Sequence, residues 1–119
     1  MTYGTHVQHE LRPLTRELRR MIPDVYAGFA ALHDAALADG ALDTKTKELI
    51  AMAIAITSEC DGCIAAHAHA AVEHGASLEE AAEAIGVAIL MSGGPGTIYG
   101  PRAFAAASEF HAARLSTAS

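Results

Sequence analysis

The sequence has no tryptophan, and aromatic residues make up only 5% of its 119 residues. Basic residues are also scarce, because eight lysines and arginines face 14 aspartates and glutamates, for a net charge of −6 with the histidines neutral. This acidity argues against a nucleic-acid partner, which requires a basic face on the protein. One basic cluster near the N-terminus is diluted by Glu10 and Glu17, and we interpret it as a solvated or interface face of a helix. Its members are Arg12, Arg16, Arg19 and Arg20.

Long apolar runs are absent as well. No run reaches the roughly 18 to 20 residues that a membrane-spanning helix needs, and residues 1–21 lack the apolar centre of a signal peptide. We therefore expect a cytoplasmic protein with no membrane partner. In that compartment a close pair of cysteines is more often catalytic or metal-binding than a structural cross-link.

Apolar residues, alanine above all, dominate the composition at 51% of the chain. This content predicts one globular domain over residues 1–119, with a flexible end at 1–8 and a core over about 20–110. Alanine favours helix but buries little area per residue. We therefore expect the protomer to gain stability by forming an oligomer.

Apolar residues recur at helical spacing, and capping residues mark the ends of each segment. The first helix is expected to begin near Arg12, because Pro13 suits a first turn. Residues 49–56 are apolar all round and predict a buried helix, whereas the glycine-rich residues 92–101 predict a flexible loop or broken helix. The predicted helices cover 9–21, 23–39, 43–58, 59–74, 77–91 and 102–115. The expected fold class is all-α, a compact bundle of five or six antiparallel helices.

The two cysteines of the chain stand three residues apart, and a histidine follows four residues later. On a helix, Cys60, Cys63 and His67 fall within an arc of roughly 60°. Two thiols at this spacing can close a disulfide, bind a soft metal or react with an oxidant. We expect Ser58 to cap this helix, with Asp61 as its acidic partner. The helix N-terminus favours a thiolate, and the charge of Asp61 opposes it.

A buried carboxylate is predicted to join this group. Glu48 lies about eleven residues before the bend near 58–60, and His67 about eight after it. In an antiparallel hairpin the two differ by roughly 4 to 5 Å along the axis, within reach of a glutamate side chain. Carboxylate, imidazole and thiol then form a proton relay. The second thiol can condense with a sulfenic acid on the first and close a disulfide.

This pattern of Glu48, eleven residues, Cys60-x-x-Cys63, three residues and His67 resembles the active site of the alkylhydroperoxidase D / carboxymuconolactone decarboxylase family, over about residues 20–110. The resemblance implies an all-helical homotrimer or homohexamer with no cofactor and no metal. It implies a thiol-dependent antioxidant enzyme that reduces a hydroperoxide substrate or relays electrons to a partner peroxiredoxin. The implied electron donor is a lipoyl or thioredoxin-like dithiol.

The resemblance also implies the site residues: Cys60 and Cys63 as the redox pair, with Glu48 and His67 as the proton relay. The decarboxylases of the family do not need a pair of cysteines, so the pair points to the redox branch. The family's best-studied peroxidase has a histidine or an aromatic residue between its cysteines, where this chain has Asp61 and Gly62.

Three alternatives stay open at this point. Cys60, Cys63 and His67 could supply three ligands of a zinc site, although His69 points away from that face and His74 lies some 10 Å further along. The chain could be a cofactor-free lyase of the decarboxylase type. It could also be a helical oligomer that senses redox state without catalysis. The remaining histidines are expected to be solvated or to serve packing, and these are His6, His9, His33 and His111.

Overall fold

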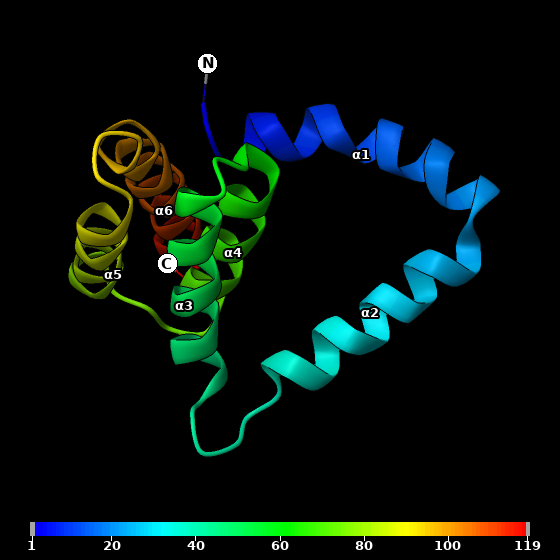
Figure 1. The fold of residues 1–119 in the computed structure, drawn as a ribbon, viewed down its shortest axis with the longest axis horizontal. Helices are drawn as coiled ribbons and strands as arrows, with labels where there is room; N and C mark the ends of the chain where they lie inside the picture. Colours follow the sequence, from blue (N-terminus) through cyan, green and yellow to red (C-terminus); the bar gives the residue numbers. More distant parts are fainter. Residues whose placement is uncertain (1, 119) are drawn as a thin grey trace.

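The computed structural model describes residues 2–118, with the side chains of residues 2–117. Within these residues there are six helices and no strand, which confirms the all-α class (Figure 1). The helices are α1 (Thr5–Met21), α2 (Pro23–Leu37), α3 (Thr44–Thr57), α4 (Asp61–Glu73), α5 (Leu78–Ser92) and α6 (Gly96–Ala118). None of the helices in the described part of the chain combines the length and the apolar character needed to cross a membrane.

Helices α3 to α6 form a bundle that encloses the core (Figure 1). Met52 and Ile56 of α3 and Ile64 of α4 are fully buried. They meet small residues of α6, where Ala103 and Ala106 are also fully buried. Small side chains let helix backbones approach closely, so an alanine-rich sequence can still pack a dry core.

Helices α1 and α2 extend from this bundle as an arm (Figure 1). Neither helix contains a buried residue. Large apolar side chains of the arm are instead exposed, and Phe29 retains 65% of its accessible surface. The amphipathic pattern that predicted these helices therefore has no partner within the chain.

The apolar run at residues 49–56 is only partly buried. Met52 and Ile56 face the core, but Ile50 is 46% exposed and Ile54 is 59% exposed. The prediction of a helix buried all round is thus wrong for the single protomer. Helix α3 has neighbours on one side only, and its second apolar side lies on the surface.

The N-terminal segment contacts α6, and the flexibility expected for residues 1–8 stays a prediction; Met1 lies outside the described residues. The backbone N–H of Thr5 donates to Oε1 of Glu109 at 2.5 Å. Gly4 is buried so closely against Phe110 that an added Cβ would lie 2.9 Å from its ring. Helix α1 begins here, seven residues before Arg12, and Pro13 lies inside it.

Helix α6 begins at Gly96 and α5 ends at Ser92, so only residues 93–95 of the predicted loop lie outside the helices. An added Cβ on Gly100 would lie 3.0 Å from Cγ2 of Ile85, and one on Gly96 would lie 2.9 Å from Cα of Ile89. These two glycines let the first turns of α6 pack against α5. Their role is close helix packing rather than flexibility.

Candidate functional site

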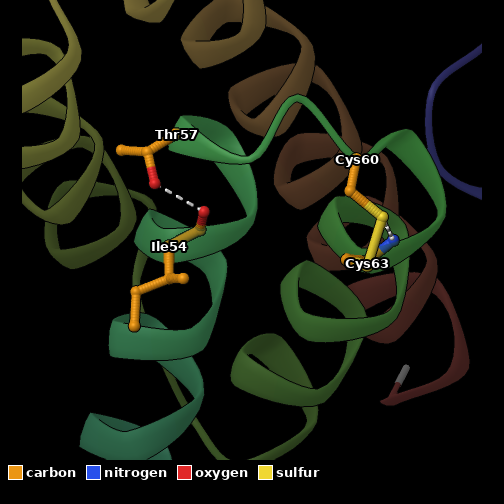
Figure 2. The surroundings of a disulfide bond; sticks show 4 residues. All are labelled: Ile54, Thr57, Cys60 and Cys63. Carbon is orange, nitrogen blue, oxygen red and sulfur yellow. Dashed lines mark hydrogen bonds between the residues drawn. A yellow bond between two sulfur atoms is a disulfide. The ribbon is translucent and has the colours of Figure 1, made fainter.

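The two cysteines form a disulfide at the start of α4 (Figure 2). Their Cα atoms lie 5.3 Å apart. Cys60 is the N-cap of α4, and its Sγ accepts the backbone N–H of Cys63 at 3.2 Å. The predicted cap, Ser58, is instead the C-cap of α3. A sulfur atom therefore receives the partial positive charge of the helix N-terminus, which stabilises a thiolate at Cys60 after reduction.

The two sulfur-bearing residues differ in exposure. Cys63 is exposed, whereas Cys60 is half-buried where α3 turns into α4. Figure 2 shows this short turn, which follows Thr57 at the end of α3. A reagent from solution therefore meets Cys63 more readily than Cys60.

The negative charge between the cysteines has a cation beside it. Arg102 of α6 donates to both carboxylate oxygens of Asp61, at 3.1 and 3.3 Å. Its guanidinium also lies over the rings of Tyr3 and Tyr99, at 5.0 and 4.6 Å from their centroids. Partial burial lowers the pKa of Arg102, but the hydrogen bond and charge of Asp61 outweigh it and raise that pKa. The ion pair offsets the charge with which Asp61 opposes a thiolate at the neighbouring sulfurs.

Glu48 and His67 meet across the α3–α4 hairpin, as the position of the bend predicts. Oε1 of Glu48 lies 2.6 Å from Nδ1 of His67. Only 3% of Glu48 is exposed, so the histidine supplies the partner that a buried carboxylate requires. We assign Nδ1–H of His67 as the donor in its hydrogen bond to Glu48. In this tautomer Nε2 carries no proton and can accept one.

Cys63 and His67 are four residues apart on α4, so they lie on the same face one turn apart. The four residues predicted from the sequence are thus positioned by two consecutive helices. Glu48 is buried, His67 is bonded to it, and Cys63 lies one turn nearer the helix N-terminus. This order can move a proton from a thiol to an imidazole that a carboxylate holds in place.

His33 is a neighbour of His67 that the sequence did not identify. It lies on α2, and its ring stacks on that of His67 with 6.2 Å between centroids and 19° between planes. No local pattern could have found it, because only the tertiary structure returns the end of α2 to α4. His69, by contrast, stacks on Phe110 at 4.3 Å, away from the relay.

No group of three or more histidine, cysteine, aspartate or glutamate side chains between residues 2 and 117 is arranged to hold a metal ion. Cys60, Cys63 and His67 therefore do not form the ligand group that the zinc alternative assumed. In this structure the two sulfurs are bonded to each other.

Comparison with known proteins identifies a family and several relatives that are similar to this chain. The model of the carboxymuconolactone decarboxylase family matches residues 23–109. An uncharacterised protein of Cupriavidus necator is 40% identical over 83 residues, which cover 70% of this chain and 74% of the relative. Uncharacterised protein 4 of the cox locus of Paracoccus denitrificans is 41% identical over 85 residues, covering 71% and 77%.

Two solved structures share the fold. A carboxymuconolactone decarboxylase family protein from Legionella pneumophila, solved in its apo form, superposes with a TM-score of 0.86 at 41% identity, covering 90% of this chain and 96% of that one. A second structure, from Thermotoga maritima, gives a TM-score of 0.73 at 29% identity, with 87% and 94% coverage. Involvement in an antioxidative response has been suggested for the Thermotoga protein.

Proposed function

The chain belongs to the carboxymuconolactone decarboxylase family, and we propose that it is a thiol-dependent antioxidant enzyme. Its reaction is the reduction of a hydroperoxide through a dithiol–disulfide cycle of Cys60 and Cys63. The observation that carries the proposal is the Cys60–Cys63 disulfide, with Cys63 one helical turn from the bonded pair of His67 and Glu48. The antioxidative response suggested for the Thermotoga relative supports the same branch of chemistry.

In the oxidative half of the cycle, Cys63 is the thiol that attacks. It is exposed, and it lies four residues before His67. Nε2 of His67 takes the thiol proton while Glu48 holds Nδ1. The thiolate attacks one peroxide oxygen, an S–O bond forms and the O–O bond breaks. The leaving alkoxide takes the proton from His67 and departs as an alcohol.

Cys60 resolves the sulfenic acid on Cys63. Its thiolate attacks the Cys63 sulfur, the S–O bond breaks, and water leaves with the remaining proton. The product is the disulfide seen in the structure. One hydroperoxide has then gained two electrons and two protons, and one dithiol has lost them.

A donor dithiol, lipoyl or thioredoxin-like, completes the cycle by two exchange steps. Its thiolate attacks the exposed sulfur of Cys63, and Cys60 leaves as a thiolate. The N–H of Cys63 that already bonds Sγ of Cys60 stabilises this leaving group. The donor's second thiol then displaces Cys63 and leaves the donor as a disulfide. A partner peroxiredoxin, reduced in turn by the dithiol of this chain, is the other route for the electrons.

We also propose that the protein assembles into a homotrimer or homohexamer. An arm with no buried residue has too little contact to be stable alone. The α3–α5 side of the bundle offers a second uncovered apolar surface of the same character. Exposed apolar residues on the two surfaces include Leu14, Met21, Phe29 and Leu32 on the arm, and Ile54, Val87 and Met91 on the bundle.

Turnover kinetics test the proposed reaction. Peroxide consumption is measured with a dithiol donor in the parent protein, in Cys63→Ser and in Cys60→Ser. We expect multiple turnovers in the parent and none in either variant, with a sulfenic acid trapped in Cys60→Ser only. A parent protein that consumes no peroxide while its thiols stay reduced contradicts the proposal. Lyase activity that survives replacement of both cysteines would establish the cofactor-free alternative instead.

A further inference from the structure

We propose that a groove between α1 and α4 binds the carboxylate of an anionic reactant through Arg12 and Arg19. This inference rests on the proposed dithiol cycle, because it concerns which reactants that cycle accepts. The groove has a volume of about 280 Å³. Its wall on α1 includes Gln8, Arg12, Thr15 and Arg19, and its floor on α4 includes Gly62 and Ala66.

The wall residues share one face of α1. Their spacing of four, three and four residues keeps them within an arc of roughly 60°. Two guanidinium groups therefore point along the same groove, separated by about two turns of helix. Arginine presents a planar fork of N–H donors that matches a carboxylate, so this face is suited to an anionic group.

These arginines have no internal partner among the described residues. Arg20 pairs with Glu17 at 3.3 Å, whereas no ion pair involves Arg12, Arg16 or Arg19. The chain has a net charge of −6 and only eight basic residues, and half of these lie between residues 12 and 20. A cluster of unpaired cations on an acidic protein favours an anion from outside the chain.

The groove adjoins the reactive cysteine. Gly62 immediately precedes Cys63, and Ala66 follows it by three residues. Neither cysteine is among the residues that line the groove. Around α4, the groove residues are centred about 80° from Cys63, so Cys63 lies roughly a quarter turn of the helix away from the groove. A reactant whose carboxylate binds the arginines must reach this distance around α4 to place its reactive end at Cys63.

Gly62 lies in close contact with Leu11 of α1. A Cβ at this position would lie 2.8 Å from Cδ1 of Leu11, so a larger residue would require the Leu11 side chain to move. Leu11 and Gly62 also line a second cavity, of about 300 Å³. Its other lining residues are Tyr3, His6, Val7, Glu10, Leu14 and Asp61. The combined site offers cations on one side of Leu11. On the other side it offers apolar side chains beside two carboxylates that already have partners, Glu10 with His6 and Asp61 with Arg102.

This arrangement suits an aliphatic carboxylate that carries either a hydroperoxide or a dithiol. Either reactant of the proposed cycle, the oxidant or the electron donor, could carry the carboxylate. The oxidant would then be a fatty-acid hydroperoxide, or the donor would be a carboxylate-bearing dithiol. Matched pairs of charged and neutral reactants distinguish the two sources.

The experiment compares kcat/KM within each pair. The donor pair is dihydrolipoate and dihydrolipoamide, and the oxidant pair is linoleic acid hydroperoxide and its methyl ester. We expect the anionic member of one pair to be preferred by the parent protein, and this preference to fall about tenfold in Arg12→Gln/Arg19→Gln. That factor corresponds to about 1.4 kcal/mol. The control is Arg20→Gln, a change of the same type outside the groove wall, which should keep the parent's preference.

A loss of preference in the donor pair assigns the site to the dithiol, and one in the oxidant pair assigns it to the hydroperoxide. A preference unchanged in both pairs, or lost equally in Arg20→Gln, overturns the inference while leaving the cycle intact. Titration with octanoate, which is redox-inert, tests binding without turnover. It should shift the backbone amide resonances of Gly62 and Ala66 in the parent, but neither in the double variant nor at about 0.5 M salt. Absence of these shifts in the parent overturns the inference, even in a protein with no peroxidase activity.

Discussion

Replacing Glu48 by glutamine separates the chemistry of the relay from the stability of the fold. Glutamine has nearly the same shape as glutamate, and its amide oxygen can still accept the Nδ1–H of His67. In the parent protein Nδ1 of His67 lies 2.6 Å from Oε1 of Glu48. What disappears is the negative charge that holds a protonated imidazole. Because positioned acid–base groups contribute about 10² to 10⁴-fold to rate, we expect kcat/KM for hydroperoxide to fall about 10² to 10³-fold in Glu48→Gln.

The free energy of unfolding should change much less. The substitution removes a charge from a site that is 3% exposed and keeps a hydrogen-bond acceptor there. A neutral hydrogen bond in place of a charged one changes stability by about 1 kcal/mol. Urea denaturation therefore shows a small shift in midpoint with an unchanged slope, as expected for an intact fold.

The matched control is Glu83→Gln on the exposed surface of α5, which should change neither quantity. Steady-state peroxide consumption with a fixed dithiol donor gives the rates. A Glu48→Gln protein that keeps its activity within about twofold would refute the relay. So would a rate loss that only accompanies unfolding of the variant.

Three further predictions concern stability and assembly. Met52→Ala removes a fully buried side chain and should lower the free energy of unfolding by about 2 to 5 kcal/mol, measured in urea. The hydrogen bond from Lys45, followed by that from the backbone N–H of Ser77, lowers the pKa of Glu80 in the folded protein. Ionised Glu80 therefore contributes its full stabilisation of the fold above the unfolded pKa of 4.5, and this contribution is lost as the pH falls through the lower folded pKa. Unfolding midpoints of Glu80→Gln should therefore fall less with pH below about 4.5 than those of the parent; equal slopes would contradict this. Phe29→Arg should dissociate the proposed oligomer, which light scattering after size-exclusion chromatography would show as a mass of one chain, and an unchanged mass would exclude the arm as the interface.

The centre of the site was predictable from the sequence because its geometry is local. Cys60, Cys63 and His67 all lie within the first two turns of α4, counted from its N-cap. Glu48 is related to them by a single hairpin, whose stagger follows from the rise of a helix. The same reasoning could not find His33, because its approach to His67 depends on the path of the whole arm.

The errors have a common physical cause, which is that local patterns do not report tertiary contacts. Gly96 and Gly100 lie in a glycine-rich segment of the kind that is typical of loops, yet they allow α6 to pack against α5. Pro13 is typical of a first helical turn, yet α1 begins at Thr5, whose backbone N–H donates to Glu109 of α6. Ile54 belongs to an apolar run that predicts burial, and the surface it would pack against is absent from a single chain.

The central claim is that Cys60 and Cys63 are a catalytic redox pair, and thiol titration with a parallel zinc assay tests it most directly. The reduced protein is treated with one equivalent of hydroperoxide, and free thiols are counted before and after. For a catalytic redox pair, we expect the two free thiols per chain to fall to none without any bound zinc, and a dithiol donor to restore both. A thiol count that peroxide leaves unchanged would contradict a catalytic redox role for Cys60 and Cys63. So would zinc bound in a one-to-one ratio and released only as the thiols are oxidised.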